Sequence, residues 1–191
     1  SQNIRQILAI MVTDIVNYTE TMNDNEDKAW EYLKKQRNII KPTVSKMNGQ
    51  MFKEMGDGTF SKFRSAIEAV KCAVKVQEEA NLNDLPIRIA VHLGDVMDDG
   101  IDVIGMGVNI ASRIQQLADP GNIVVSDDVW SQIRGQSDME GRSIGEQDIK
   151  GYHKNVEVYE LTYNPDGSIT QKVKVTETVT ITDEEGKKIK S

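Results

Sequence analysis

The sequence has few of the residues on which many disulfide-rich proteins and metalloenzymes depend. Its single cysteine, Cys72, excludes an internal disulfide and a cysteine-based zinc cluster. Its two histidines, His92 and His153, supply too few ligands for zinc hydrolase chemistry. The longest apolar run, Ile7 to Val12, is too short to cross a bilayer. The chain does not open on a basic and then apolar signal segment, so we expect a reducing, cytoplasmic setting and no membrane segment.

The overall composition is that of an ordinary globular domain. Of the 191 residues, 38% are apolar and 28% are charged, which is enough to bury a core without a disulfide or a structural metal. Thirty acidic and 23 basic side chains give a net charge of −7, and this acidic balance argues against a general nucleic-acid binder. The length favours one domain with at most a small appendage.

Hydrophobic patterning predicts an alternation of strands and helices. Apolar runs predict strands at 7–12, 50–55, 59–63, 87–97, 123–125 and 156–161. An apolar stripe from Trp30 to Met47 predicts a helix that follows an acidic turn at 23–27, contains Pro42 and ends at Asn48-Gly49. Similar stripes predict helices that begin at Ala66 and that span about 108–118. The tripeptide 56–58, Gly-Asp-Gly, is typical of a tight hairpin.

The order strand, helix, hairpin, helix, strand predicts an α+β fold. We expect a ferredoxin-like βαββαβ core, with helices packed on a mainly antiparallel sheet. Residues 164–191 differ in character, because they are rich in threonine and valine and their charges cancel. We therefore expect a domain over residues 1–163 and an appended β-hairpin or linker over 164–191.

Two aspartates stand where strands end. Asp14 follows the first apolar strand, and Asp57 lies in the hairpin. Carboxylates at the rim of a sheet suit Mg²⁺ or Mn²⁺ shared with a phosphate. Each has a simpler interpretation, Asp14 as a helix N-cap and Asp57 as a turn residue.

A polar pair marks the helix predicted near residue 110. Asn109 and Arg113 are four residues apart and therefore share one helix face. Asparagine and arginine together can hydrogen-bond a sugar or a phosphate. Taken alone, the pair is better interpreted as an intrahelical polar pair on a solvated face.

Taken together, these segments resemble the catalytic domain of class III nucleotidyl cyclases, which make cyclic AMP or cyclic GMP from nucleoside triphosphates. The resemblance follows the family order and spacing over residues 7–162. The matching stretches are 12–19, 52–58, 87–94, 102–105, 108–113 and 149–151. Each stretch is weak by itself, and their common order makes the similarity specific.

The resemblance implies an enzyme, an adenylate cyclase, and assigns residues to its metal ions and phosphates. Asp14 and Asp57 match the aspartates that hold two Mg²⁺ or Mn²⁺ ions per active site, with Ile15 beside them. The loop 15–19, with Ile15, Tyr18 and Thr19, matches the loop whose backbone N–H groups hold the terminal phosphates. Arg88 and Lys150 match bases that bind the triphosphate. From the residues alone, Arg88 could equally be an exposed strand charge and Lys150 a surface lysine beside a turn.

Further positions match residues that read the nucleotide. Lys53 and Asp102 match a pair in which lysine donates to adenine N1 and the carboxylate accepts from the exocyclic amine. Guanine presents the reversed pattern, so the resemblance implies ATP as substrate and cyclic AMP and pyrophosphate as products. Asn109 matches the residue that orients the ribose, and Arg113 the one that stabilises charge at the α-phosphate.

One position departs from the family pattern. Family members usually carry glycine where Asn17 stands, in the phosphate loop. Asparagine tolerates the left-handed backbone conformation better than other non-glycine residues, so we expect the loop to survive. His92 lies in a matching stretch, and we expect it to be a structural, hydrogen-bonded histidine.

The resemblance also implies a homodimer with active sites shared between subunits. One subunit would supply Asp14, Asp57 and Arg88, and its partner the base, ribose and α-phosphate contacts. Such domains are commonly fused to sensors, so a fused or separate sensor domain is expected. The alternatives are a cyclase for GTP or a pyrimidine triphosphate, and a catalytically silent regulatory module.

Overall fold

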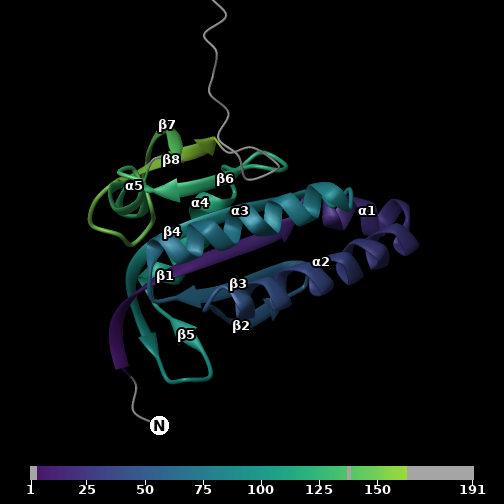
Figure 1. The fold of residues 1–191 in the computed structure, drawn as a ribbon, viewed down its shortest axis with the longest axis horizontal. Coiled ribbons are helices and arrows are strands. Elements are labelled where there is room, and N and C mark those ends of the chain that lie inside the picture. Colours follow the sequence, from purple (N-terminus) through teal and green to yellow (C-terminus); the bar gives the residue numbers. More distant parts are fainter. Residues whose placement is uncertain (1–3, 137–138, 163–191) are drawn as a thin grey trace, which may run out of the picture.

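The computed structural model describes residues 4–136 and 139–162. Its helices are α1 (Tyr18–Asp24), α2 (Glu26–Lys46), α3 (Ala66–Leu82), α4 (Met106–Gln115) and α5 (Asp127–Ile133). Its strands are β1 (Ile4–Ile15), β2 (Gln50–Met55), β3 (Gly58–Phe63), β4 (Ile87–Asp98), β5 (Val103–Ile104), β6 (Ile123–Ser126), β7 (Glu140–Gln147) and β8 (Val156–Thr162). Figure 1 shows the helices arranged around one twisted sheet.

The sheet confirms the predicted α+β architecture. Its strand order is β2-β3-β1-β4-β6-β8-β7, with β5 paired to the far end of β4. The strands β1, β2, β3 and β4 pair antiparallel, in the arrangement of a βαββαβ unit. Among the described strands, only β4 and β6 pair in parallel, so the sheet is mainly antiparallel.

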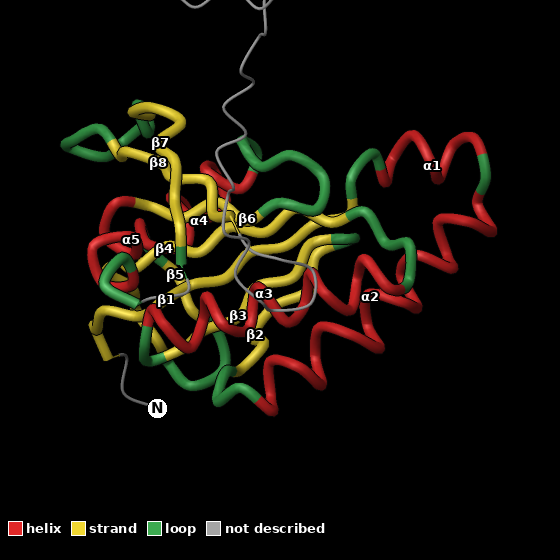
Figure 2. Tube along the Cα trace, turned by 45° about the horizontal axis from the view of Figure 1, so that its top comes forward, coloured by secondary structure: helices red, strands yellow, loops and turns green. Residues whose placement is uncertain are grey.

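Alternation along β1 divides the core into two sides. Ala9, Met11 and Ile15 pack toward α2 and α3, together with the apolar residues of α5. Leu8 and Ile10 pack on the opposite face, where Ala111 of α4 joins them. Figure 2 shows α2 and α3 side by side along the first face. The next outward residue on the α4 side of β1, after Val12, is Asp14, so the pleat places this carboxylate at the end of an apolar row.

The long helix α2 differs in its buried face from the predicted stripe. Trp30 is 47% exposed, whereas its neighbour Ala29 is buried. Gln36 is also buried, because it faces the sheet rather than solvent. The helix continues through Pro42 to Lys46.

Four elements were not predicted, because each lacks a strong apolar pattern. α1 has seven residues and none of them is buried. β5 has two residues, and β7 is exposed along most of its length. α5 has seven residues, too few for two turns of periodicity to stand out. The predicted helix at 108–118 begins two residues earlier, at Met106, and ends at Gln115.

Two further expectations concern the segment 164–191 and membrane-spanning helices. The hairpin or linker expected at 164–191 lies outside the described residues. Within the described part of the chain, none of the helices is both long and apolar enough to cross a membrane.

Candidate active site

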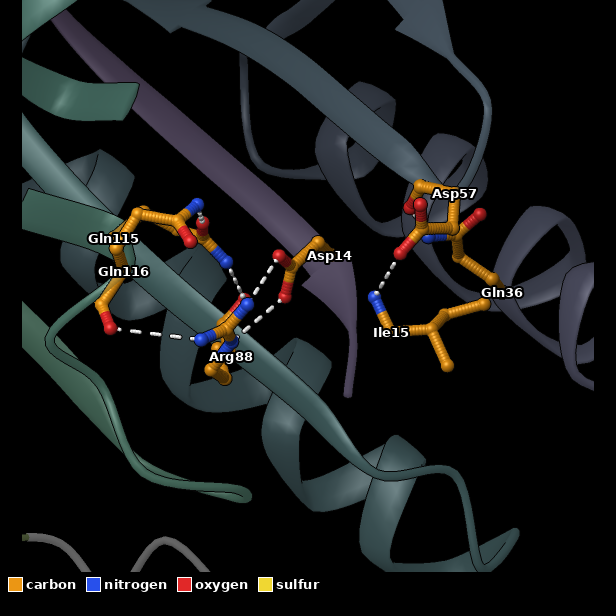
Figure 3. A network of polar contacts seen from close by, with 7 residues as sticks. All are labelled: Asp14, Ile15, Gln36, Asp57, Arg88, Gln115 and Gln116. Carbon is orange, nitrogen blue, oxygen red and sulfur yellow. Dashed lines mark hydrogen bonds and ion pairs between the residues drawn. The ribbon is translucent and has the colours of Figure 1, made fainter. Parts of the chain in front are cut away.

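A paired arginine and aspartate lie where β1 and β4 run side by side. Asp14 and Arg88 are direct partners in the antiparallel register. Arg88 donates from Nε to Asp14 Oδ1 at 2.9 Å and from Nη2 to Asp14 Oδ2 at 2.6 Å (Figure 3). The side chains are 22% and 19% exposed, so this bidentate pair is largely shielded from water. Arg88 is therefore not a free strand charge, and Asp14 is not a helix N-cap.

Asp57 approaches the same strand end from the β2–β3 hairpin. Its Oδ2 accepts the backbone N–H of Ile15 at 3.0 Å, and its backbone carbonyl accepts a hydrogen bond from Gln36 Nε2 (Figure 3). Burial raises the pKa of the Asp57 carboxyl, and the nearby negative charge of Asp14 raises it further. The Ile15 N–H and the Arg88 charge act in the opposite direction. Two carboxylates therefore share one shielded corner of the sheet.

Three glutamines support this corner, and sequence reasoning missed them. Gln36 holds the Asp57 turn from α2. Gln115 Nε2 donates to the Arg88 carbonyl at 3.5 Å, and the Gln116 carbonyl accepts from Arg88 Nη1 at 3.5 Å. A signal existed for Gln36, since a polar residue three positions after Leu33 falls on the apolar face of the helix. Gln115, the last residue of α4, carries a similar signal, since it lies four positions after buried Ala111, whereas Gln116 carries none.

The loop after β1 contains Asn17, the residue that departs from the family's glycine. Asn17 has φ 53° and ψ 32°, a left-handed conformation that asparagine tolerates. The Val16 N–H donates to the Pro86 carbonyl at 2.8 Å, and the Thr21 N–H donates to the Asn17 carbonyl at 2.9 Å. Tyr18 and Thr19 therefore open α1 directly after the strand end that carries Asp14.

The α4 helix presents the predicted polar pair on its outer face. Asn109 and Arg113 are exposed, whereas Ile110 and Ile114 are buried against the sheet. The N-cap residue before the helix is Gly105, whose φ of 125° is unfavourable for other residues. Neither polar side chain makes a hydrogen bond or ion pair within residues 4–136 and 139–162.

The remaining predicted residues lie elsewhere on the surface. Lys53 is exposed on β2, with its Nζ 6.0 Å from the centre of the Phe60 ring. Asp102 lies in the turn between β4 and β5 and accepts the Val103 N–H at 2.8 Å. Lys150 is exposed in the turn before β8.

The chain brings Asp14, Asp57 and Arg88 together and places Asp102 at the other end of the sheet. In the β1–β4 register, the row that joins Asp14 to Arg88 is ten residues from the row that joins Ile4 to Asp98. At about 3.3 Å per residue, that is roughly 30 Å along the strand. Figure 1 accordingly shows α1 and the β4–β5 hairpin at opposite ends of the sheet. Among the described residues, Asp14 and Asp57 share no hydrogen bond or ion pair with Lys53, Asp102 or Arg113.

The donor atoms at the Asp14 corner suit a hard divalent cation. The carboxylates of Asp14 and Asp57 and the backbone carbonyl of Ile15 offer oxygen ligands. Burial and the charge of Asp14 disfavour the anionic form of Asp57, and a bound cation would favour it. The described residues contain no group of three or more His, Cys, Asp or Glu side chains able to hold a metal. Mg²⁺ commonly binds through one or two carboxylates together with substrate phosphates, so the residues present fit this ion.

His92 has the structural role expected from the sequence. It is 2% exposed, and its Nδ1 lies 2.7 Å from Ser126 Oγ. Burial lowers the pKa of its imidazole to about 4. A neutral histidine on the far side of β4 from α3 therefore joins β4 to the end of β6.

Sequence comparison identifies relatives of this chain. A family model described as the adenylate and guanylate cyclase catalytic domain matches residues 2–163. The protein named "Putative adenylate cyclase 3" from Rhizobium meliloti (strain 1021) is 34% identical over 170 residues, which cover 84% of this chain and 29% of that protein. The chain thus spans less than a third of that relative's length.

Solved structures show the same fold. The adenylate/guanylate cyclase/hydrolase from Silicibacter pomeroyi has a TM-score of 0.79 at 26% identity, over 85% of this chain and 100% of that chain. The adenylyl cyclase CyaB from P. aeruginosa has a TM-score of 0.77 at 21% identity, over 86% and 97% of the two chains. With a family match over most of its length and a 34% identical relative, the chain belongs to the family of adenylate and guanylate cyclase catalytic domains.

Proposed function

We propose that this domain converts ATP to 3′,5′-cyclic AMP and pyrophosphate at active sites shared by two copies of the chain. One observation carries the proposal. Asp14, Asp57 and Arg88 meet at one end of β1, whereas Asn109 and Arg113 are exposed and unpaired within the described residues. A twofold axis that brings the second set of one copy against the first set of the other would complete two sites.

The reaction joins two atoms of one nucleotide. The ribose 3′-oxygen bonds to the α-phosphorus, the bond from that phosphorus to the α–β bridging oxygen breaks, and the 3′-hydroxyl proton is released. Two Mg²⁺ or Mn²⁺ ions, held by Asp14, Asp57 and the Ile15 backbone, would lower the pKa of the 3′-hydroxyl and neutralise the leaving pyrophosphate.

The side chains of the second copy would position the nucleotide. Asn109 holds the ribose so that its 3′-oxygen lies in line with the leaving group, an orientation effect. Arg113 neutralises charge that develops around the α-phosphorus. Lys53 donates to adenine N1, and Asp102 accepts from the exocyclic amine.

The first copy would bind the triphosphate tail. Arg88 and the backbone N–H groups of Tyr18 and Thr19 lie next to the Asp14 corner, and Lys150 adds a positive charge from the partner. Arg88 holds both oxygens of Asp14 in this structure. Phosphate oxygens compete for the same guanidinium, so substrate binding releases Asp14 to act as a ligand.

A triphosphate panel tests the chemistry. Purified protein with Mn²⁺ is given ATP, GTP, CTP or UTP, and cyclic products are separated by chromatography. We expect cyclic AMP to dominate. A dominant cyclic GMP or pyrimidine product would replace the ATP assignment, and the absence of any cyclic product from a folded dimer would refute the proposal.

A mixing experiment tests the shared site. Asp57→Ala and Arg113→Ala should each abolish activity, since each removes a group from both sites. In a mixture, half of the randomly paired dimers contain one intact site out of two, so activity returns to at most about a quarter of wild type. The absence of recovery from two dimeric, folded variants would contradict the model.

A further inference from the structure

A shielded ion pair lies at the end of the sheet remote from Asp14. Lys62 on β3 donates from Nζ to Asp98 Oδ2 at 2.5 Å, and the two side chains are 14% and 9% exposed. Gln6 of β1 donates from Nε2 to the same Asp98 oxygen at 3.2 Å. One carboxylate therefore joins three neighbouring strands, β1, β3 and β4.

The same carboxylate also binds the backbone of the turn that follows β4. Asp98 Oδ1 accepts the backbone N–H of Gly100 at 2.8 Å. The next residue, Asp99, accepts the N–H groups of Ile101 and Asp102 at 2.8 Å each. Asp98 then pairs with Val103 in the β4–β5 ladder, and Val103 is buried on the α4 side of the sheet. The turn from 99 to 102 is thus fastened to the sheet through Asp98.

Asp102 ends this fastened turn. One of its carboxylate oxygens, Oδ1, accepts the Val103 N–H, and Oδ2 makes no hydrogen bond within the described residues. The backbone of the turn therefore holds Oδ1 and leaves Oδ2 available to a further donor. A displaced turn would move that oxygen relative to any base that it contacts.

We propose that Lys62 and Asp98 are positioning residues that set the location of Asp102 and thereby the selectivity for adenine over guanine. This inference rests on the proposed function, in which Asp102 reads the base. Neither residue touches the nucleotide. Loss of the Lys62 charge removes the ion pair that anchors Asp98 to β3, so the carboxylate shifts together with the Gly100 N–H that its Oδ1 accepts.

The chain supplies a matched control. Arg5 and Asp95 also join β1 to β4 by a bidentate ion pair, and their side chains are 76% and 44% exposed. Among the described residues, the Asp95 side chain makes no hydrogen bond or ion pair with the 99–102 turn. Arg5→Met therefore removes a cation of similar length that is paired with the same strand, β4, while the Lys62–Asp98 ion pair stays in place.

The test compares Lys62→Met, Lys62→Arg and Arg5→Met in the full chain. Because a displaced hydrogen-bonding group loses discrimination, we expect Lys62→Met to reduce the ATP:GTP ratio of kcat/KM about tenfold, mainly through KM for ATP. Lys62→Arg should restore most of the ratio, and Arg5→Met should match wild type. An unchanged ratio in folded, active Lys62→Met would overturn the inference.

A second measurement is independent of catalysis. Amide hydrogen exchange at Gly100, Ile101 and Asp102 should be faster in Lys62→Met than in wild type and unchanged in Arg5→Met. Unchanged exchange in Lys62→Met would also overturn the inference. If Lys62→Met does not fold, Asp98→Asn, which keeps an acceptor for Gly100, takes its place with the same expected results. Failure of wild type to convert ATP would instead refute the proposed function, and hydrogen exchange would then decide the role of the pair.

Discussion

Replacement of His92 by glutamine should remove the part of the pH dependence of the unfolding free energy that comes from the His92 imidazole. The imidazole is 2% exposed, and burial lowers its pKa from 6.5 to about 4. Asp128 favours the charged form and Lys154 disfavours it, and both effects are smaller than that of burial. Glutamine keeps a hydrogen-bonding group for Ser126 but does not titrate.

The sign and size of the effect follow from proton binding. Between pH 6.5 and about 4, the unfolded chain binds a proton at His92 and the folded chain does not, so stability falls as the pH falls. Each pH unit well inside that window costs about 1.4 kcal/mol. Integrated from about pH 7.5 to about pH 5.5, the His92 contribution is about 1 kcal/mol.

Urea unfolding followed by tryptophan fluorescence measures this contribution. The lower pH stays above the sequence pI of about 5.0, where the protein would be least soluble. The free energy of unfolding should drop by about 1 kcal/mol more in wild type than in His92→Gln between the two pH values. The part of the substitution's effect on the unfolding free energy that does not depend on pH cancels in this comparison. Equal pH dependence in the two proteins would refute the neutral, buried assignment of His92.

Three further predictions concern buried groups. Cys72 should resist thiol reagents in the native state and react after unfolding, because burial raises its pKa to about 12; thiol titration with and without urea checks this. Gly107→Ala should lower the unfolding free energy by about 1 kcal/mol or more, despite the higher helix propensity of alanine. The reason is that the new Cβ would lie 3.0 Å from the Asp95 carbonyl oxygen and 2.9 Å from Val96 Cγ1. A more stable variant in urea unfolding would contradict this packing. Gln36→Leu should cost about 1–2 kcal/mol of stability, because the Asp57 carbonyl loses its donor; thermal unfolding measures this, and an unchanged midpoint would show that the bond contributes nothing.

Local patterns were sufficient for much of the fold because they depend on near neighbours in the chain. The unbroken apolar run at 7–12 predicted a strand, and the described strand is buried at 8–13. The hairpin at 56–58 needs only the turn residues themselves. Elements without such patterns, such as β7 and α1, are held by pairing or by chain connection and could not be found this way.

The candidate site also has features that follow from the sequence and contacts that depend on the fold. Its residue types and order, from Asp14 to Arg113, follow from the sequence and its resemblance to the cyclase family. The pairing of Arg88 with Asp14 depends on the β1–β4 register, in which residues 74 positions apart become direct neighbours. The contact from Gln36 to the Asp57 turn likewise needs α2 to be placed against the sheet.

The sequence by itself thus determined most of the strands and helices and predicted which side chains carry the chemistry, because hydrophobic period and residue type are local properties. Only the tertiary structure decided which of those side chains meet. It gathered Asp14, Asp57 and Arg88 at one end of the sheet and placed the Asp98 turn at the other. The physical reason is that strand register and the packing of helices on the sheet fix distances between residues far apart in the chain, and no local pattern encodes those distances.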